Sequence, residues 1–435
     1  MPEGLRRDLG TIESYAALIG VLIGAGIFKV TSDAWALTGP SVILGYFVLA
    51  PAILTTSIAY SLFISTPLGL EPGGEYAHIS RTFGGHALAF IGVWLKIISY
   101  IGALAYLARA FADYLGAGVV VAAASILFFY VVHVIGVKWF GRVQVWMCIL
   151  LGVSIVILVV PGLFAIRPEN YRPFFTHGAK GFAASLPPLF FAYAGFESLA
   201  QAAGEVRDST RRLPRVFLLG ITATTIIYLL MSIVAFGVLP GQQLRASSAP
   251  MTAVASQYLP AGGAVLITLG ALMAITTSLN ATMLVPSRVA IMLAEDGLMP
   301  KWLARISPRT GTPIIGLTIT AAAALVLLLS GQISLALNIA VFALVVLYFL
   351  HSFALLVLPW ANRDLFQSVT VRIPLVIQRI AAVISMVAMG GIIVLSSLST
   401  IELALIWSAV GALIYAIAHR GAARRIENAE KPKLA

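Results

Sequence analysis

Long apolar runs separated by short polar breaks constrain this chain more than any other feature of its sequence. A helix crosses the hydrocarbon core of a bilayer in about 20 residues, and an apolar run near this length is typical of a membrane span. Only 10% of the residues are charged, against roughly 25% in soluble domains. The sequence therefore predicts an all-α membrane protein with about 12 transmembrane helices, over residues 12–38, 41–65, 86–115, 117–136, 143–166, 182–203, 214–238, 262–291, 313–330, 334–357, 379–397 and 401–418.

The distribution of positive charge predicts the orientation of these spans. With the N-terminus inside, one side of the membrane receives twenty arginines and lysines, including Arg6, Arg7, Lys431 and Lys433. The other side receives only Arg167, Arg172, Lys180 and Arg245. Because cytoplasmic loops carry the excess of positive charge, we expect a multi-pass protein of the inner (plasma) membrane with both termini cytoplasmic. The net charge of +11 then reflects topology and contact with membrane lipid, and we expect no nucleic acid partner.

The sequence offers no sign of an enzyme. Cys148 is the single cysteine, so no intramolecular disulfide can form. The six histidines lack the spacing of metal ligands, and no hydrolase, metalloprotease or P-loop motif is present. We therefore expect no cofactor beyond a coupling ion.

Two of the apolar runs contain residues that interrupt a helix. The first carries Gly20, Gly24 and Gly26, and each interior glycine costs about 1 kcal/mol relative to alanine. An unwound backbone is tolerated at membrane depth only where it lines a protein cavity, so a break here predicts a binding site. The alternative is that Gly20 and Gly24 form a small-residue face for close helix packing.

The second interruption falls five spans later. The stretch "PPLFFAYAGFESLAQAAGEV" contains Pro187 and Pro188, followed by Ala194, Gly195 and Glu197. Paired interruptions at corresponding positions are typical of transporters built from inverted repeats. We expect the two repeats at 12–166 and 182–357, two accessory helices at 379–418, and cytoplasmic segments at 1–11 and 419–435.

Four motifs carry a resemblance to a known family. The stretches "GVLIGAGIF", "PGGEYAHISRTFGG", "FAYAGFE" followed by "GEVRDSTRRLPR", and "AEDGLMPKWLARISPRTGTP" resemble the amino acid–polyamine–organocation (APC) family of permeases over roughly residues 10–360. The resemblance implies the leucine-transporter-type five-plus-five inverted repeat with discontinuous helices 1 and 6, and amino acid transport by alternating access. Some relatives bind a second subunit through a cysteine, but no outer-loop cysteine is present here. We expect no obligatory partner subunit and leave the oligomeric state open.

The breaks provide groups for both charges of an α-amino acid. Backbone N–H groups at the start of a helix favour an anion, and carbonyls at the end of a helix favour a cation. We expect the substrate carboxylate at the N–H groups of Ala25, Gly26 and Ile27. The ammonium should face the carbonyls of Leu22 or Ile23 and the second break near Phe190, Phe191 and Ala194. By resemblance, Phe191 is an aromatic gate, although it could equally be a packing phenylalanine.

Ionisable residues within spans are candidates for gating or coupling. We assign this role to Lys29, Lys96 and Glu197, and Glu197 is the expected acidic partner of one of the lysines. The alternative is a structural ion pair. Arg109, Arg288 and Glu205 lie near span ends, where we expect them to extend toward the membrane surface or to stabilise the rims.

Five neutral oxygens predict a Na⁺ site. They are the carbonyls of Gly20, Ile23 and Ala274 and the hydroxyls of Thr277 and Ser278, and they resemble the sodium site of sodium-coupled members of this fold. Some proton-coupled relatives carry a lysine in span five, where this sequence has Leu151. The alternatives are hydroxyls bonded only to their own helix, proton coupling through Lys29 or Lys96, and uncoupled exchange.

The substrate class follows from the scarcity of acidic groups near the breaks. A cationic substrate requires acidic cavity residues, and only Glu197 is available, so we expect uncharged, apolar L-amino acids. Carriage of polyamines, other organic cations or inorganic ions is the alternative on the same fold. A channel is disfavoured because channels need a continuous pore lined by rings of carbonyls or charges.

Overall fold

The structure is a computed structural model that describes residues 9–70 and 73–430. All regular elements of these residues are helical, and an isolated bridge joins Leu9 to Val206. Eight helical segments are long and apolar enough to cross a membrane, and the first of them, Thr11–Ile64, covers two of the predicted runs. Two shorter apolar helices cover Val119–Ile135 and Ile314–Leu329. The predicted all-helical fold is thus confirmed for the described residues, and the count of twelve crossings stays a prediction.

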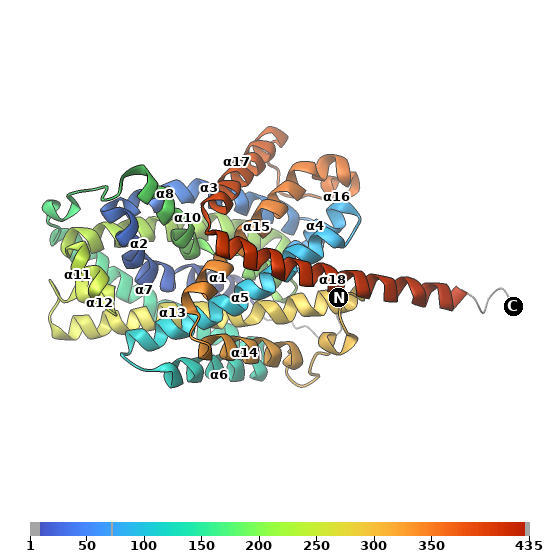
Figure 1. Ribbon diagram of the computed structural model, residues 1–435, viewed down its shortest axis with the longest axis horizontal. Helices are drawn as coiled ribbons and strands as arrows, with labels where there is room; N and C mark the ends of the chain where they lie inside the picture. The colour runs from blue at the N-terminus through green and yellow to red at the C-terminus, as the bar shows by residue number, and fades with distance from the viewer. Residues whose placement is uncertain (1–8, 71–72, 431–435) are drawn as a thin grey trace.

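The helices run side by side along the long axis of the molecule (Figure 1). Each predicted run coincides with one or more of them. Those of the first half are α1 (Thr11–Leu22), η1 (Gly26–Val30), α2 (Thr31–Thr38), η2 (Gly39–Ser41), α3 (Val42–Ile64), η3 (Pro67–Leu70), α4 (Glu75–Phe83), α5 (Ala87–Tyr114), α6 (Val119–Ile135), α7 (Val137–Phe164) and η4 (Pro168–Tyr171).

The second half begins with a second interrupted helix. Its elements are α8 (Gly178–Phe190), η5 (Phe191–Tyr193), α9 (Ser198–Gln201), η6 (Ala203–Glu205), α10 (Ser209–Val238), α11 (Gly241–Ala246), α12 (Pro250–Ala255), α13 (Ala261–Glu295), η7 (Lys301–Ala304), α14 (Ile314–Leu329), α15 (Ile333–Ala361), α16 (Arg363–Gln367), α17 (Leu375–Leu395) and α18 (Leu398–Glu430).

The first apolar run is not one helix. Helix α1 ends at Leu22, residues 23 and 24 form bends, and the chain resumes as the π-helix η1 at Gly26. A π-helical turn has one more residue between hydrogen-bonded groups than an α-helix, and such turns are frequent at functional sites. The break therefore falls within the glycine-rich stretch.

The second interruption lies beyond the prolines that suggested it. Pro187 and Pro188 are inside α8, and the helix gives way only after Tyr193. Ala194 is extended, and Gly195 has a φ of 101°, a conformation that residues with a side chain rarely adopt. Gly195, rather than the proline pair, is thus the residue that permits this change of direction.

The two interrupted segments lie at the centre of the helix bundle. Helix α1 packs against α7, α10 and α13, and η1 contacts η5. The long helices α5 and α15 pack extensively against each other. This arrangement places residues of both breaks between α5, α13 and α15.

The loops fall at opposite ends of the bundle. Helices α11 and α12 lie at the left end in Figure 1, whereas α4 and α16 lie toward the right. Arg245 belongs to α11 and Arg81 to α4, and the predicted topology places these two charges on opposite sides of the membrane. Four charges on which that prediction also rests, Arg6, Arg7, Lys431 and Lys433, lie outside the described residues.

Candidate functional site

A cavity lies where the two breaks meet. Its cavity volume is about 30 Å³. Its walls come from α5 and α15, and both breaks and α13 complete it. The lining residues are Val21, Leu22, Gly24, Ala25, Gly26, Ser99, Tyr100, Ala103, Leu107, Phe191, Ala194, Gly195, Ser278, Thr282, Ala340 and Leu344.

Each of the three glycines in the first break permits a close approach. A Cβ at Gly26 would lie 2.3 Å from the Cα of Ala192 in η5. A Cβ at Gly24 would lie 2.0 Å from the Ser278 Oγ, and one at Gly20 would lie 2.3 Å from the Gln144 Nε2. These glycines therefore allow close packing of helices as well as the break in the first apolar run.

Five of the predicted substrate residues line the cavity, and three do not. Leu22, Ala25, Gly26, Phe191 and Ala194 are among its walls. Three others are buried but are not among the lining residues, namely Ile23, Ile27 and Phe190.

Two aromatic rings belong to the second break. Phe191 lines the cavity and meets the ring of Tyr106 edge-on, with the ring centroids 5.2 Å apart. Phe190 packs against Tyr348 instead. Of the two phenylalanines, only Phe191 is placed to cover a bound molecule.

Tyr228 of α10 connects the two breaks and was not identified from the sequence. Its hydroxyl bonds the carbonyl of Leu22 in the first break and, at 2.5 Å, that of Ala192 in the second. Leu22 is one of the carbonyls predicted to face the ammonium of a substrate. In the sequence, Tyr228 is a single tyrosine within an apolar span, and its position there does not reveal which groups its hydroxyl contacts.

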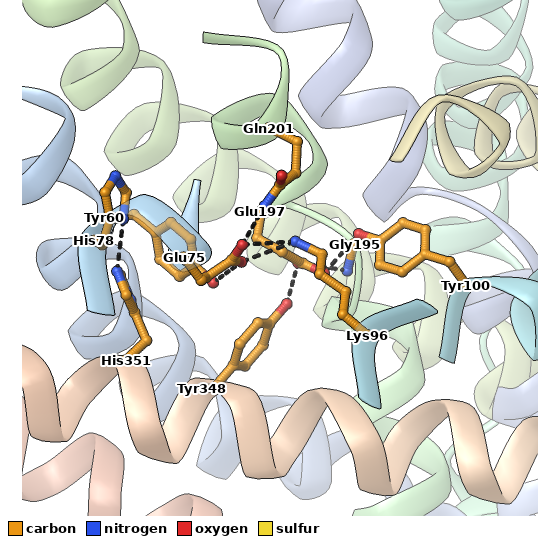
Figure 2. A network of polar contacts seen from close by, with 10 residues as sticks. All are labelled: Tyr60, Glu75, His78, Lys96, Tyr100, Gly195, Glu197, Gln201, Tyr348 and His351. Atoms are coloured by element: carbon orange, nitrogen blue, oxygen red, sulfur yellow. Dashed lines mark hydrogen bonds and ion pairs between the residues drawn. The ribbon is translucent and has the colours of Figure 1, made fainter. Parts of the chain in front are cut away.

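Lys96 and Glu75 form a buried ion pair (Figure 2). The Lys96 Nζ lies 3.0 and 2.8 Å from the two carboxylate oxygens of Glu75, and both side chains are fully buried. Glu75 also accepts hydrogen bonds from Tyr60 and Gln201. A buried carboxylate with four donor contacts is satisfied as the anion.

Glu197 is not the partner of either lysine. Its carboxylate is fully buried and accepts hydrogen bonds from the Tyr100 hydroxyl at 2.6 Å, the Gly195 N–H at 3.0 Å and the Tyr348 hydroxyl. Figure 2 shows Tyr100 and Tyr348 on either side of it. Since Tyr100 and Gly195 line the cavity, Glu197 lies directly behind its wall.

A pair of histidines packs beside Tyr60, with His78 from α4 and His351 from α15. The Nδ1 of His78 and the Nε2 of His351 are 2.9 Å apart, and both rings are buried. Burial, followed by the charge of Lys96, lowers the pKa of His78 to about 3. His78 is therefore neutral at physiological pH, and one of the two facing ring nitrogens donates to the other.

Four of the five oxygens proposed for Na⁺ come together. The Thr277 hydroxyl lies 2.8 Å from the Gly20 carbonyl and 2.7 Å from that of Ala274, and the Ser278 hydroxyl lies 3.1 Å from Gly20 O. Ser278 also contacts the carbonyl of Val21 at 3.1 Å, and no such contact joins it to Ile23 among the described residues. Both hydroxyls also donate to the Ala274 carbonyl of their own helix, which is the alternative arrangement, and Na⁺ binding by these oxygens stays a prediction.

A glutamine from span five reaches the same region. The amide nitrogen of Gln144 lies 3.3 Å from the carbonyls of both Ala16 and Thr277. Gln144 therefore joins α1 to α13 beside the oxygen cluster. Leu151, further along the same helix, is buried and apolar.

Three of the remaining predicted charges have different surroundings. Lys29 is partly exposed, 3.9 Å from Asp33. Arg288 does not extend to the surface, because it is fully buried and its Nε lies 3.0 Å from Glu205. Of the two expected roles, this ion pair excludes the extension of Arg288 toward the surface, because a facing carboxylate removes the need for water.

Comparisons with known proteins agree on one family. The model of the family described as amino acid permease matches residues 9–412. The branched-chain amino acid permease BcaP of Bacillus subtilis (strain 168) is 26% identical over 348 residues, 72% of each chain. The serine/threonine exchanger SteT of the same organism is 27% identical, over 82% of this chain and 84% of SteT.

A plant relative is named for a different class of substrate, the cationic amino acids. The vacuolar cationic amino acid transporter 4 of Arabidopsis thaliana is 28% identical over 72% of this chain and 56% of its own length. The substrates named for these relatives differ, but all three are amino acid transporters. With the family match over nearly the whole chain, they show that this protein belongs to the amino acid permease family.

Proposed function

We propose that this protein is a secondary carrier that moves uncharged, mainly apolar L-amino acids across the plasma membrane by alternating access. The observation that carries the proposal is the cavity at the meeting point of the two interrupted helices. Transporters of this architecture bind substrates at such points, near mid-membrane.

The proposed architecture has twelve crossings in a five-plus-five inverted repeat with two accessory helices. In this architecture, Thr11–Ile64 makes two crossings and each of the other seven long segments makes one. The two shorter apolar helices and the interrupted α8–α9 segment make the remaining three. Both termini are proposed to be cytoplasmic, on the basis of the loop charges.

The ends of the interrupted helices provide the polar contacts for a zwitterion. The first N–H groups of the helix that begins at Gly26 have no preceding turn to bond, so they favour the substrate carboxylate. The carbonyl ends of α1 and η5 favour the ammonium. Opening and closing of the bundle about these contacts would expose the cavity to each side in turn.

The part of the cavity that would hold the substrate's side chain favours an apolar substrate. Ala103 and Leu107 of α5 and Ala340 and Leu344 of α15 form this part of the wall. No Asp, Glu, Lys or Arg is among the described lining residues, because Tyr100 and Gly195 separate the cavity from Glu197. A charged side chain would therefore lose its hydration without gaining a counterion.

Coupling to Na⁺ is proposed at the oxygen cluster between α1 and α13. Gly20, Val21, Ala274, Thr277 and Ser278 would hold the ion. A bound cation would supply positive charge that stabilises the carbonyl end of α1. The second candidate is proton coupling, which the buried carboxylates of Glu75 and Glu197 beside Lys96 favour.

Uptake by purified protein in liposomes tests the proposal. Leucine, alanine, arginine and putrescine should be compared under imposed Na⁺ and proton gradients. We expect saturable leucine or alanine uptake with counterflow and an apparent affinity between about 1 μM and 1 mM. Single-channel currents, or arginine as the preferred substrate, would contradict it.

The same liposomes distinguish the two coupling ions. Under Na⁺ coupling, uptake falls when choline replaces external Na⁺ and in the Thr277→Ala, Ser278→Ala double variant. Uptake that is unchanged in choline but lost when the proton gradient collapses would instead support the Glu75, Lys96 and Glu197 network.

A further inference from the structure

A groove separate from the substrate cavity opens between α3, α10 and the segment that precedes α17. Its volume is about 840 Å³, and it shares no lining residue with the cavity. Ser57 and Ser61 of α3 are buried and belong to its floor. Arg211 and Arg215 of α10 line one side, and Thr370 lines the other.

The two arginines give the groove an uncompensated positive charge. Both are exposed, and neither forms an ion pair with a described residue. Arg212, between them in sequence, is paired with Asp208 at 3.0 Å. None of the described lining residues is acidic. Two guanidinium groups four residues apart on a helix lie on one face, so they can act on a single anion.

The groove continues into an apolar surface along the same helix face. Leu218 follows Arg215 by three residues, lines the groove and is 52% exposed. Further along α10, Ile226 is 53% exposed. Ile58 and Ile373 contribute apolar walls on the facing elements. A ligand that matches this surface carries an anionic group at one end and a hydrocarbon portion at the other.

We propose that this groove binds the head group of an anionic phospholipid, with its acyl chains along the exposed face of α10. Basic pockets between membrane helices bind anionic lipid head groups through the phosphate, and arginine suits the phosphate because its guanidinium can donate two parallel hydrogen bonds. A free phosphate would leave the apolar part of the groove without a ligand. A peptide would have to compete with the lipid in which α10 is embedded.

Native mass spectrometry of the full-length protein in detergent tests the proposal. The protein is titrated with phosphatidylglycerol and, separately, with phosphatidylcholine. We compare the wild type with the Arg211→Gln, Arg215→Gln variant. An arginine near an anionic lipid surface contributes a factor of about 5, so we expect phosphatidylglycerol binding to weaken about 25-fold. Phosphatidylcholine binding should not change.

A matched control removes the same charge elsewhere. Arg305 and Arg309 are exposed and, by the proposed topology, lie on the same side of the membrane. The Arg305→Gln, Arg309→Gln variant should bind phosphatidylglycerol like the wild type. Equal losses in both double variants, or no loss in either, would overturn the proposal.

Two further experiments address the folding of the variant and the contribution of the lipid's acyl chains. If the Arg211, Arg215 variant does not give a wild-type melting transition, Thr210→Glu places a negative charge in the groove instead and should weaken binding of the same lipid. Glycerophosphoglycerol, which lacks acyl chains, should bind at least tenfold more weakly than phosphatidylglycerol. Equal binding would show that the groove recognises a free phosphate ester and not a lipid.

Discussion

Gly26 lies directly against the second break at Ala192. A Cβ there would overlap the backbone of Ala192, so even Gly26→Ala requires the breaks to separate. We expect reduced substrate affinity in Gly26→Ala and no measurable binding in Gly26→Leu. Gly152→Ala is the matched control, because a Cβ at Gly152 meets nothing within 4 Å. Normal transport by Gly26→Leu would show that the substrate does not occupy the space between the breaks.

The Lys96–Glu75 pair is a second feature at the scale of single residues. Lys96→Met leaves a buried, uncompensated carboxylate, which typically costs about 3–5 kcal/mol of stability. We expect a large drop in the melting temperature in detergent. The Lys96→Met, Glu75→Gln double variant should recover much of it, because it removes both charges together.

The double variant also separates a structural role from a coupling role. If it melts like the wild type and keeps its response to ion gradients, the pair is structural. If it folds but loses the proton dependence of uptake, Lys96 and Glu75 take part in coupling. A double variant no more stable than Lys96→Met would contradict the expectation that the two charges compensate each other.

At the scale of elements, Tyr228 joins three parts of the chain. Its hydroxyl on α10 contacts the carbonyl ends of both α1 and η5, so it fixes the distance between the two interrupted helices. Tyr228→Phe removes these hydrogen bonds and leaves two buried carbonyls with fewer donors, at a cost of about 1–3 kcal/mol. We expect KM for uptake to rise by about 5-fold or more, with smaller changes in kcat.

Tyr258→Phe is the control for this prediction. Tyr258 donates to the Leu158 carbonyl of α7, away from the breaks. Its removal deletes a partly buried hydroxyl contact but should leave KM unchanged. A similar rise of KM in both variants would show that the effect is a general loss of stability.

At the scale of the whole molecule, the charge distribution predicts the orientation. In a Cys148→Ser background, we expect an impermeant thiol reagent to label Ser248→Cys in intact cells. Pro308→Cys should be labelled only after the membrane is permeabilised. Both positions are exposed, so a difference in labelling reports the side of the membrane. Labelling of Pro308→Cys in intact cells would contradict the predicted topology.

The sequence by itself determined the helical class, the segments and the location of the first break. Apolar runs long enough to span a bilayer leave helices as the means of satisfying their backbone groups, so every predicted run coincides with helices. Most ends agree to within a few residues, but α18 continues twelve residues past the predicted end of the last run. Gly20, Gly24 and Gly26 marked the first break because glycine weakens a helix wherever it occurs. Such properties are local, and local properties can be read from the order of the residues.

Only the tertiary structure decided which side chains meet. Glu197 was the expected partner of a lysine, but Lys96 reaches Glu75 from a different helix, and Glu197 is held by two tyrosines. Tyr228 and Gln144 were not identified because their function depends on carbonyls far away in the chain. A buried polar group must find a partner, but packing of the whole bundle determines which partner it finds.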